Sequence, residues 1–309
     1  MNKIKVVLSG LIFPFTMMHF FWRAFERRND VDLFVAGPYT DDWIPWNNGI
    51  RLPKKYVKVP NLALPATMSN MHPNSKVVDV HLPWRDTDLW IQCDAGWHFI
   101  NRPNAKVVAH IQTDPHVLKS TYTMPKAYSD LKFCMQTPYM NEDEIYLSYA
   151  YDPDIHFPMP LEKKYDACLI GLQYEHRNLL VNRLRSLGLN VYYSIGEVYD
   201  EYRQLYNESK IALSWSSMQD LPARVWEAIG MGLPLVCNRV PDMNLHFEEG
   251  KHYLGFDTIS EAEKQVMTLI TNDELQKQLS TNALLISTGN SWDNRVEYIM
   301  NNYYEQLGY

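Results

Sequence analysis

The sequence has little glycine, few cysteines and no excess of basic residues, and each shortage narrows the classes of protein that fit. Glycine accounts for only 13 of 309 residues. The four cysteines lie far apart inside apolar runs, which argues against a disulfide framework or a zinc cluster and predicts buried free thiols in a reducing compartment. Residues 1–158 carry 16 basic and 16 acidic residues, and the remainder carries 13 and 20. Neither half therefore has the basic surplus of a dedicated nucleic-acid-binding protein.

A long apolar run of the kind that crosses a membrane is also missing. Residues 6–22 carry no charge, but Pro14 interrupts them, Thr16 and His19 are polar, and no small-residue cleavage site follows. We expect a buried strand, a loop and an amphipathic helix capped by Thr16, and a cytoplasmic protein with no transmembrane segment. The local basic patch RLPKKYVKVP, residues 51–60, is interpreted as a solvated loop or edge strand.

Strand and helix patterns alternate in two series along the chain. Short apolar runs that favour buried strands are separated by segments with helical spacing of apolar residues. A segment with three prolines, residues 151–160, lies between the two series. The pattern predicts an α/β protein with two doubly wound, Rossmann-like domains, residues 1–158 and 159–290, that face a cleft. We expect the last helix, residues 291–309, to return to the first domain.

The stretch LPARVWEAIGMGLPLVCN, residues 221–238, predicts a helix over 222–231 that is capped by Asp220. Gly232 and Pro234 then end the helix, and a buried strand follows. In a doubly wound sheet, the amino end of such a helix lies where ligands bind, and its free N–H groups favour an anion.

Arg224 and Glu227 share the polar face of this predicted helix. A guanidinium suits a phosphate, whereas a carboxylate suits the vicinal hydroxyls of a sugar. The alternative is an ordinary ion pair between residues three apart on a solvated face, which contributes a few tenths of a kcal/mol.

The pattern R-V-W-E-A-I-G-M-G-L-P-L-V resembles the donor-binding segment of GT-B glycosyltransferases, nearest to the spore-maturation-protein type of group 1 enzymes. The resemblance continues in DACLIGLQYEHRNLLVNRL, EYRQLYNESKIALSW, FEEGKHYLGFDTISEAEKQV and SWDNRVEYI. It covers residues 160–300, and in the N-terminal half it is limited to strand order and to the loops after Asp94 and Asp114.

The resemblance implies transfer of a sugar from a nucleotide diphosphate donor, expected to be UDP-linked, to a hydroxyl acceptor. It implies that Glu227 holds the ribose, that Arg224 and Arg177 face the diphosphate, and that the turn at Gly171 lies near the nucleotide. Gln219, next to Asp220, stands where many relatives have a further glutamate. Gly10 is the one glycine of GLIFPFT, a loop that is usually glycine-rich and approaches the donor.

An inverting transfer needs a base, which we expect at the end of a strand in the N-terminal half. The candidates are Asp94 with His98 in CDAGWHF, and Asp114 with His116 in QTDPH. Either aspartate also fits a loop cap, because Asp before Pro is a common turn start. His110 lies within a strand pattern and is expected to be a buried histidine.

Two D-x-D patterns, residues 86–88 and 152–154, have no further carboxylate or histidine at metal-ligand spacing, so we expect neither a metal nor a cofactor. The acceptor stays open between a glycan, a small molecule and a hydroxymethylated base in DNA, the last as in small phage enzymes of similar fold. DNA would engage the basic patch and the loop tryptophans, at positions 43, 46, 84 and 97. A nucleotide-sugar epimerase or hydrolase, and a non-catalytic nucleotide-sugar binder, would fit the same two-domain fold.

Overall fold

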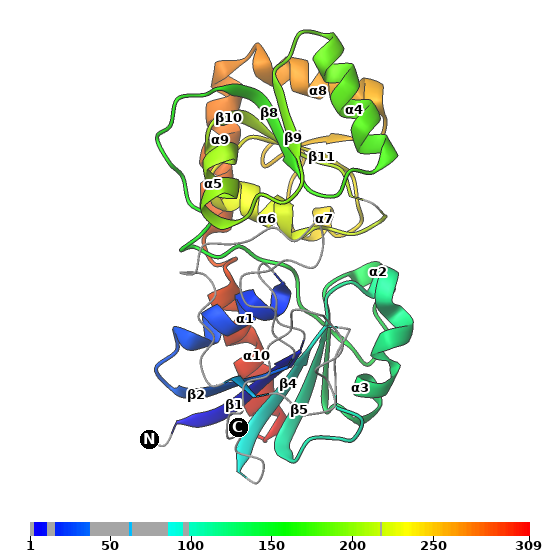
Figure 1. Cartoon of the computed structure of the whole chain (residues 1–309), viewed down its shortest axis with the longest axis vertical. Coiled ribbons are helices and arrows are strands. Elements are labelled where there is room, and N and C mark those ends of the chain that lie inside the picture. Colours follow the sequence, from blue (N-terminus) through cyan, green and yellow to red (C-terminus); the bar gives the residue numbers. More distant parts are fainter. Residues whose placement is uncertain (1–2, 11–15, 38–61, 64–85, 95–98, 217) are drawn as a thin grey trace. The chain divides into compact units, whose positions relative to one another are not determined.

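The computed structural model describes residues 3–10, 16–37, 62–63, 86–94, 99–216 and 218–309. The basic patch, the four loop tryptophans and His98 lie outside these residues. The chain divides into two compact units. Unit 1 comprises Met1–Ser148 with Trp292–Tyr309, and unit 2 comprises Tyr149–Ser291. The sheets of both units are parallel, as the alternating pattern predicts (Figure 1).

Unit 1 contains a seven-stranded parallel sheet with the strand order β3-β2-β1-β4-β5-β6-β7. Its strands are β1 (Ile4–Gly10), β2 (Val31–Ala36), β3 (Leu62–Ala63), β4 (Thr87–Cys93), β5 (Ala105–Gln112), β6 (Leu131–Cys134) and β7 (Ile145–Tyr146). Its helices are α1 (Met17–Glu26), α2 (Pro115–Leu118), α3 (Thr123–Tyr128) and α10 (Trp292–Gln306), with 3-10 turns at Lys119–Tyr122 and Thr137–Tyr139.

The first helix and the last helix of the chain pack against each other in unit 1 (Figure 1). The Thr16 hydroxyl accepts a hydrogen bond from the His19 N–H at 3.3 Å, which confirms the predicted cap of α1. The Phe20 ring stacks on Trp292 with 5.8 Å between ring centroids. Arg27 adds a bidentate ion pair to Asp293, at 2.7 and 2.9 Å. These contacts explain why the C-terminal helix returns to the N-terminal part of the chain, as predicted.

Unit 2 contains a five-stranded parallel sheet with the strand order β12-β11-β10-β8-β9. Its strands are β8 (Tyr165–Ile170), β9 (Val191–Ser194), β10 (Ser209–Ser214), β11 (Leu235–Asn238) and β12 (Leu254–Phe256). Its helices are α4 (Glu175–Ser186), α5 (Tyr199–Asn207), α6 (Ala223–Gly230), α7 (Met243–His246), α8 (Ile259–Ile270) and α9 (Asp273–Ser287). The strand order reverses between β8 and β10, which is the switch point where open α/β sheets bind ligands.

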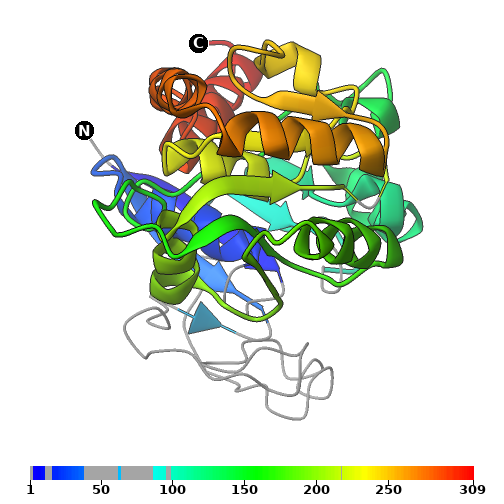
Figure 2. The ribbon, with the colours of Figure 1, turned by 90° about the horizontal axis from the view of Figure 1, so that it is seen from above.

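Alternate residues of the unit 2 strands face different helices. One face packs Leu169, Leu213 and Val236 against apolar side chains of α4 and α8, and Figure 2 shows α8 in orange along the sheet. Helices α5 and α6 contact β8, β10 and β11. The cysteines at positions 93, 134, 168 and 237 are buried and none of them is in a disulfide, as predicted. Burial raises the pKa of the Cys168 thiol and that of the Cys237 thiol, so both thiols stay protonated at neutral pH.

Helix α6 ends in a tight turn that the sequence predicts. The N–H of Gly232 donates to the Ile229 carbonyl at 2.9 Å, and the N–H of Leu233 donates to the Ala228 carbonyl at 3.1 Å. This pair of hydrogen bonds is the Schellman arrangement, which needs a left-handed residue. Gly232 supplies it with φ +68°, and a Cβ there would lie 2.9 Å from Cγ of Leu284. The left-handed backbone and the close contact with Leu284 therefore both favour glycine at position 232.

We predict that Gly232→Ala lowers the free energy of unfolding by about 2–3 kcal/mol, the sum of a left-handed alanine and a close contact with Leu284. Gly188→Ala is the matched control, because Gly188 has φ +86° and a Cβ added there would meet no atom within 4 Å. Urea unfolding of both variants should show that Gly188→Ala loses about 1 kcal/mol. Equal losses would contradict the packing argument.

Candidate functional site

Two arginines of unit 2 converge on one glycine at the carboxyl end of β8. Arg224, on α6, donates through Nε to the Ile170 carbonyl at 2.7 Å. Arg177, on α4, donates through Nε to the Trp215 carbonyl at 2.7 Å and through Nη1 to the Leu172 carbonyl at 2.8 Å. Both guanidinium groups are thus anchored by carbonyls of the loops that follow the strands. Nη1 of Arg224 also donates to the Ser214 hydroxyl oxygen at 3.5 Å. The other N–H groups are left for a ligand.

Gly171 leaves the space in which the two guanidinium groups meet. Its φ of +150° favours glycine, and a Cβ there would lie 2.2 Å from Nη2 of Arg224 and 3.6 Å from Nη1 of Arg177. Within the described residues, neither arginine forms an ion pair with a carboxylate. Burial, together with the charge of Arg224, lowers the pKa of Arg177 to about 10. The guanidinium is still protonated at neutral pH, so two like charges are held close together in a partly dry site.

Tyr193 is a further member of this site that the sequence did not reveal. It lies on β9, and its hydroxyl oxygen is buried with no hydrogen-bond partner in the described structure. Burial raises the pKa of this hydroxyl, and the nearby charges of Arg177 and Arg224 oppose that rise. A protonated hydroxyl within electrostatic range of two guanidinium groups is a candidate donor for an anion. A tyrosine in a strand pattern gives no signal of such a role before the fold is known.

Glu227 lies one helical turn beyond Arg224 on α6, and its carboxylate faces other partners. Tyr202 donates its hydroxyl to Oε2 of Glu227 at 2.6 Å, and Nε2 of His156 lies 3.8 Å from Oε1. Arg224 and Glu227 do not pair with each other among the residues that the structure describes. The interpretation of the two as a simple surface ion pair is therefore wrong for this helix. The guanidinium of Arg224 and the carboxylate of Glu227 therefore do not neutralise each other, and both can bind a ligand.

The loop before α6 differs from the prediction. Pro222, not Asp220, is the residue that precedes the first turn, and it makes no side-chain cap. The carboxylate of Asp220 accepts instead from the N–H of Met218 at 3.1 Å, two residues upstream, which stabilises the loop. Gln219 is exposed on this loop. The amino end of α6 therefore has no side-chain cap, as an anion site requires.

In unit 1, the structure brings Asp94 and Asp114 to a common tyrosine. Tyr122, which is fully buried, donates its hydroxyl to Oδ1 of Asp94 at 2.6 Å, and the N–H of Asp114 donates to the same hydroxyl oxygen at 3.2 Å. Burial and the charge of Asp94 raise the pKa of Tyr122, so its proton stays available to Asp94. Asp94 also has φ +63°, an uncommon left-handed conformation directly after β4.

The other predicted residues of unit 1 are placed as follows. His116 lies on α2 with its ring 5.7 Å from that of Tyr139, and its Nδ1 is buried with no hydrogen-bond partner in the described part of the chain. His110 is fully buried within β5, as expected. Gly10 ends β1, where a Cβ would lie 2.5 Å from the Cys93 carbonyl oxygen. Close packing between strands is thus sufficient reason for glycine at that position.

The D-x-D patterns make local contacts. Asp86 pairs with Lys5, and Asp88 pairs with Lys106 at 2.7 Å. The carboxylate of Asp152 accepts from the N–H of Asp154 at 2.9 Å. Over the described ranges, no group of three or more His, Cys, Asp or Glu side chains is arranged to hold a metal ion. In the same ranges, no helix is both long and apolar enough to cross a membrane.

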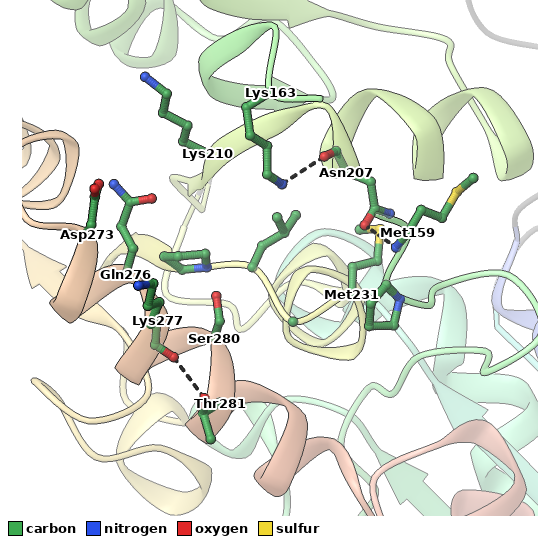
Figure 3. A pocket seen from close by; sticks show the side chains of 14 residues that line it. Met159, Lys163, Asn207, Lys210, Met231, Asp273, Gln276, Lys277, Ser280 and Thr281 are labelled. Carbon is green, nitrogen blue, oxygen red and sulfur yellow. Dashed lines mark hydrogen bonds between the residues drawn. The ribbon is translucent and has the colours of Figure 1, made fainter. Parts of the chain in front are cut away.

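A hollow of about 460 Å³ lies in unit 2 near the amino ends of β10 and β11 (Figure 3). Three lysines line it. Lys163 donates to the Asn207 carbonyl at 2.8 Å at the end of α5, and Lys210 pairs with Asp166 at 2.9 Å. The carboxyl ends of α5 and α6, which carry partial negative charge, also border the hollow. Lys163 therefore balances the end of α5 and Lys210 balances a carboxylate, and the arginine site remains the stronger candidate for an anion.

Comparison with known proteins gives a family match for the C-terminal part. Residues 158–301 match the model of a family described as glycosyl transferase-like. No curated protein matches the chain. The matched residues include the two arginines, Gly171, Tyr193 and Glu227, so the candidate site lies inside the segment that matches this family.

Solved structures resemble almost the whole chain at low sequence identity. Sucrose-phosphate synthase from Thermosynechococcus elongatus has a TM-score of 0.63 and 10% identity, with 99% of each chain covered. Anabaena Alr3699/HepE in complex with UDP and glucose has a TM-score of 0.64 and 10% identity, with 98% of this chain and all of that chain covered. A UDP-N-acetylglucosamine 2-epimerase has a TM-score of 0.54 and 12% identity, with 98% of each chain covered. The chain thus has the predicted GT-B fold, and the family match covers its C-terminal part.

We predict that inorganic pyrophosphate raises the melting temperature of the wild-type chain, because it supplies the anion that the two arginines lack. A concentration one hundred times the Kd should stabilise the fold by about 2.7 kcal/mol. Arg224→Gln and Arg177→Gln should abolish this shift. The matched control is Arg183→Gln on α4, because Arg183 pairs with Glu263 on the surface. Equal stabilisation of all four proteins would contradict the site.

Proposed function

We propose that this chain is a glycosyltransferase that moves a sugar from a nucleotide diphosphate donor, of the UDP-linked type, to a hydroxyl acceptor. The observation that carries the proposal is the pair of guanidinium groups over Gly171, one buried and one half-buried, which no carboxylate neutralises within the described residues, with the carboxylate of Glu227 one turn away. Two cations and a neighbouring carboxylate fit a diphosphate joined to a ribose. The solved HepE complex with UDP and glucose supports the choice of donor.

The arginines have a defined task in such a transfer. The bond between the anomeric carbon and the diphosphate oxygen breaks, and negative charge builds on the leaving diphosphate. Guanidinium groups that are already held by backbone carbonyls meet this charge without reorganisation, which is how preorganised electrostatics lowers a barrier. The hydroxyl of Tyr193, which lies within electrostatic range of both arginines, is a candidate further donor. Glu227 fixes the nucleoside by accepting from its ribose hydroxyls.

The acceptor hydroxyl forms the new bond to the anomeric carbon and must lose its proton. In an inverting reaction, we assign this proton to Asp94 or Asp114. Of the two, Asp94 has the more constrained geometry, because Tyr122 and a left-handed backbone fix its carboxylate. His116, and His98 from its sequence position alone, stay secondary candidates. The reaction as proposed needs neither a metal nor a cofactor.

The acceptor class is proposed as a glycan or a small molecule. The zero net charge of residues 1–158 favours these over DNA, which would need a basic surface. The second candidate is a phage enzyme that acts on hydroxymethylated bases in DNA. For the family type, we propose the spore-maturation-protein group of glycosyltransferases. Steep loss of activity with rising salt would favour DNA. An epimerase or hydrolase is separated from a transferase by analysing the products formed without an acceptor.

Glu227→Gln should weaken UDP binding about tenfold or more, because a charged acceptor of two hydroxyl hydrogen bonds is replaced by a neutral amide. Isothermal titration calorimetry measures this directly. Glu263→Gln is the matched control, because Glu263 pairs with Arg183 away from the site. An unchanged UDP affinity in Glu227→Gln would contradict the proposal that Glu227 binds the ribose.

Asp94→Asn and Asp114→Asn test the base. In an inverting enzyme, the true base variant should lose about 10²–10⁴-fold in kcat while its Kd for UDP stays the same. Transfer or hydrolysis of UDP-glucose, followed by release of UDP, is the assay. Addition of EDTA should leave the rate unchanged. Full activity in both variants would contradict a carboxylate base at these positions.

A further inference from the structure

One oxygen of the Glu227 carboxylate accepts a hydrogen bond from Tyr202, and a ring nitrogen of His156 approaches the other oxygen from beyond hydrogen-bond distance. Tyr202 donates to Oε2 at 2.6 Å, and Nε2 of His156 lies 3.8 Å from Oε1. Burial and the charge of Glu227 raise the pKa of Tyr202, so its hydroxyl remains protonated and can only donate to the carboxylate. The Glu227 side chain is 14% exposed. Each carboxylate oxygen has two lone pairs, so each oxygen keeps one for a ligand.

The tautomer of His156 follows from its backbone partner. The N–H of Asp152 donates to Nδ1 of His156 at 3.2 Å, so Nδ1 is an acceptor. In the neutral imidazole, the proton then resides on Nε2, the nitrogen that faces Glu227. The histidine is 3% exposed, and its ring meets that of Tyr202 edge to face with 5.9 Å between centroids. His156 and Tyr202 therefore form one packed pair around the carboxylate.

The segment that carries His156 is fastened to the same two helices that carry Tyr202 and Glu227. Arg203, on α5, donates to the Ile155 carbonyl at 2.9 Å, and its guanidinium lies 4.3 Å from the centre of the Phe157 ring. The ring of Tyr151 packs on Gly230 of α6, where a Cβ would lie 2.5 Å from Cδ2 of Tyr151. The imidazole is thus held in place relative to α6 from both sides of the segment.

We infer that His156 is a positioning residue for Glu227. With Tyr202, it sets the plane of the carboxylate so that one lone pair on each oxygen points to the vicinal hydroxyls of a nucleoside. A pair of hydroxyls is captured only when both oxygens are presented together, and a carboxylate with one donor is free to rotate about its last bond. The inference rests on the proposed function, because it takes the ligand of Glu227 to be a ribose.

The test compares UDP with 2′,3′-dideoxy-UDP, which keeps the base and the diphosphate but has no ribose hydroxyls. The measured quantity is the ratio of the two Kd values by calorimetry, for the wild type, His156→Leu, His156→Gln, Tyr202→Phe and Glu227→Gln. The amide nitrogen of glutamine lies near the place of Nε2 and restores a donor. Binding of the dideoxy ligand also reports whether each variant keeps a folded diphosphate site.

We expect the wild type to prefer UDP by tenfold or more, a preference of the size of one hydrogen bond to a charged group. His156→Leu and Tyr202→Phe should lose most of this preference while their affinity for dideoxy-UDP stays within about twofold. His156→Gln should regain it. A purely structural role for His156 would instead lower both affinities together and leave their ratio unchanged.

His252→Leu is the matched control. His252 accepts through Nδ1 from the N–H of Glu248 at 2.9 Å, four residues upstream, as His156 does from Asp152. It should keep the wild-type ratio. Loss of the preference in Glu227→Gln but not in His156→Leu would overturn the inference while the proposed ribose site stands. Failure of the wild type to bind UDP, or to distinguish it from dideoxy-UDP, would overturn the proposed role of Glu227 itself and the inference with it.

Discussion

The structure of the candidate site depends on two guanidinium groups, of the buried Arg177 and the half-buried Arg224, whose only partners within the described residues are neutral. Arg177 and Arg224 are anchored by carbonyls at the ends of β8 and β10, so their geometry is fixed while their charge is not neutralised. Gly171 is required because any side chain would fill the place where they meet. Leaving two like charges partly dry is unfavourable in the empty protein, and binding of an anion relieves it.

The same constraint explains the partners of Glu227. A glutamate three residues after an arginine on a helix would ordinarily pair with it and cancel its charge. Here Tyr202 binds one carboxylate oxygen, and His156 approaches the other. Arg224 and Glu227 therefore lie on one short helix without forming an ion pair with each other. The turn at Gly232 ends that helix immediately, so α6 presents both groups and then returns the chain to β11.

Much of the fold was predictable because buried parallel strands and amphipathic helices leave strong periodic patterns. The cap of α1 by Thr16 and the end of α6 at Gly232 followed from local chemistry and are confirmed. The cap by Asp220 was wrong, because its carboxylate found the nearer N–H of Met218 in the loop. Local rules identify the residues that can cap a helix, but the path of the loop decides which donor they reach.

The site was only partly predictable, and the division has a physical cause. Arg224, Glu227 and Gly171 lie in patterned segments that resemble a family motif. Tyr202, His156 and Tyr122 act through contacts that form only when the chain folds, and only the fold brings Tyr193 within electrostatic range of the two arginines. The Tyr202–Glu227 hydrogen bond, for example, joins residues 25 apart, and the Tyr122–Asp94 bond joins residues 28 apart. Tyrosine and histidine are ordinary residues in strands, helices and linkers, so the sequence alone does not identify these residues as part of a site.

A crystal structure of the chain with UDP is the most direct measurement of the central claim. The account predicts that the diphosphate lies between Arg177 and Arg224 above Gly171, with the ribose hydroxyls on Glu227. A diphosphate bound elsewhere, or a Glu227 carboxylate that still contacts only Tyr202 and His156, would contradict it.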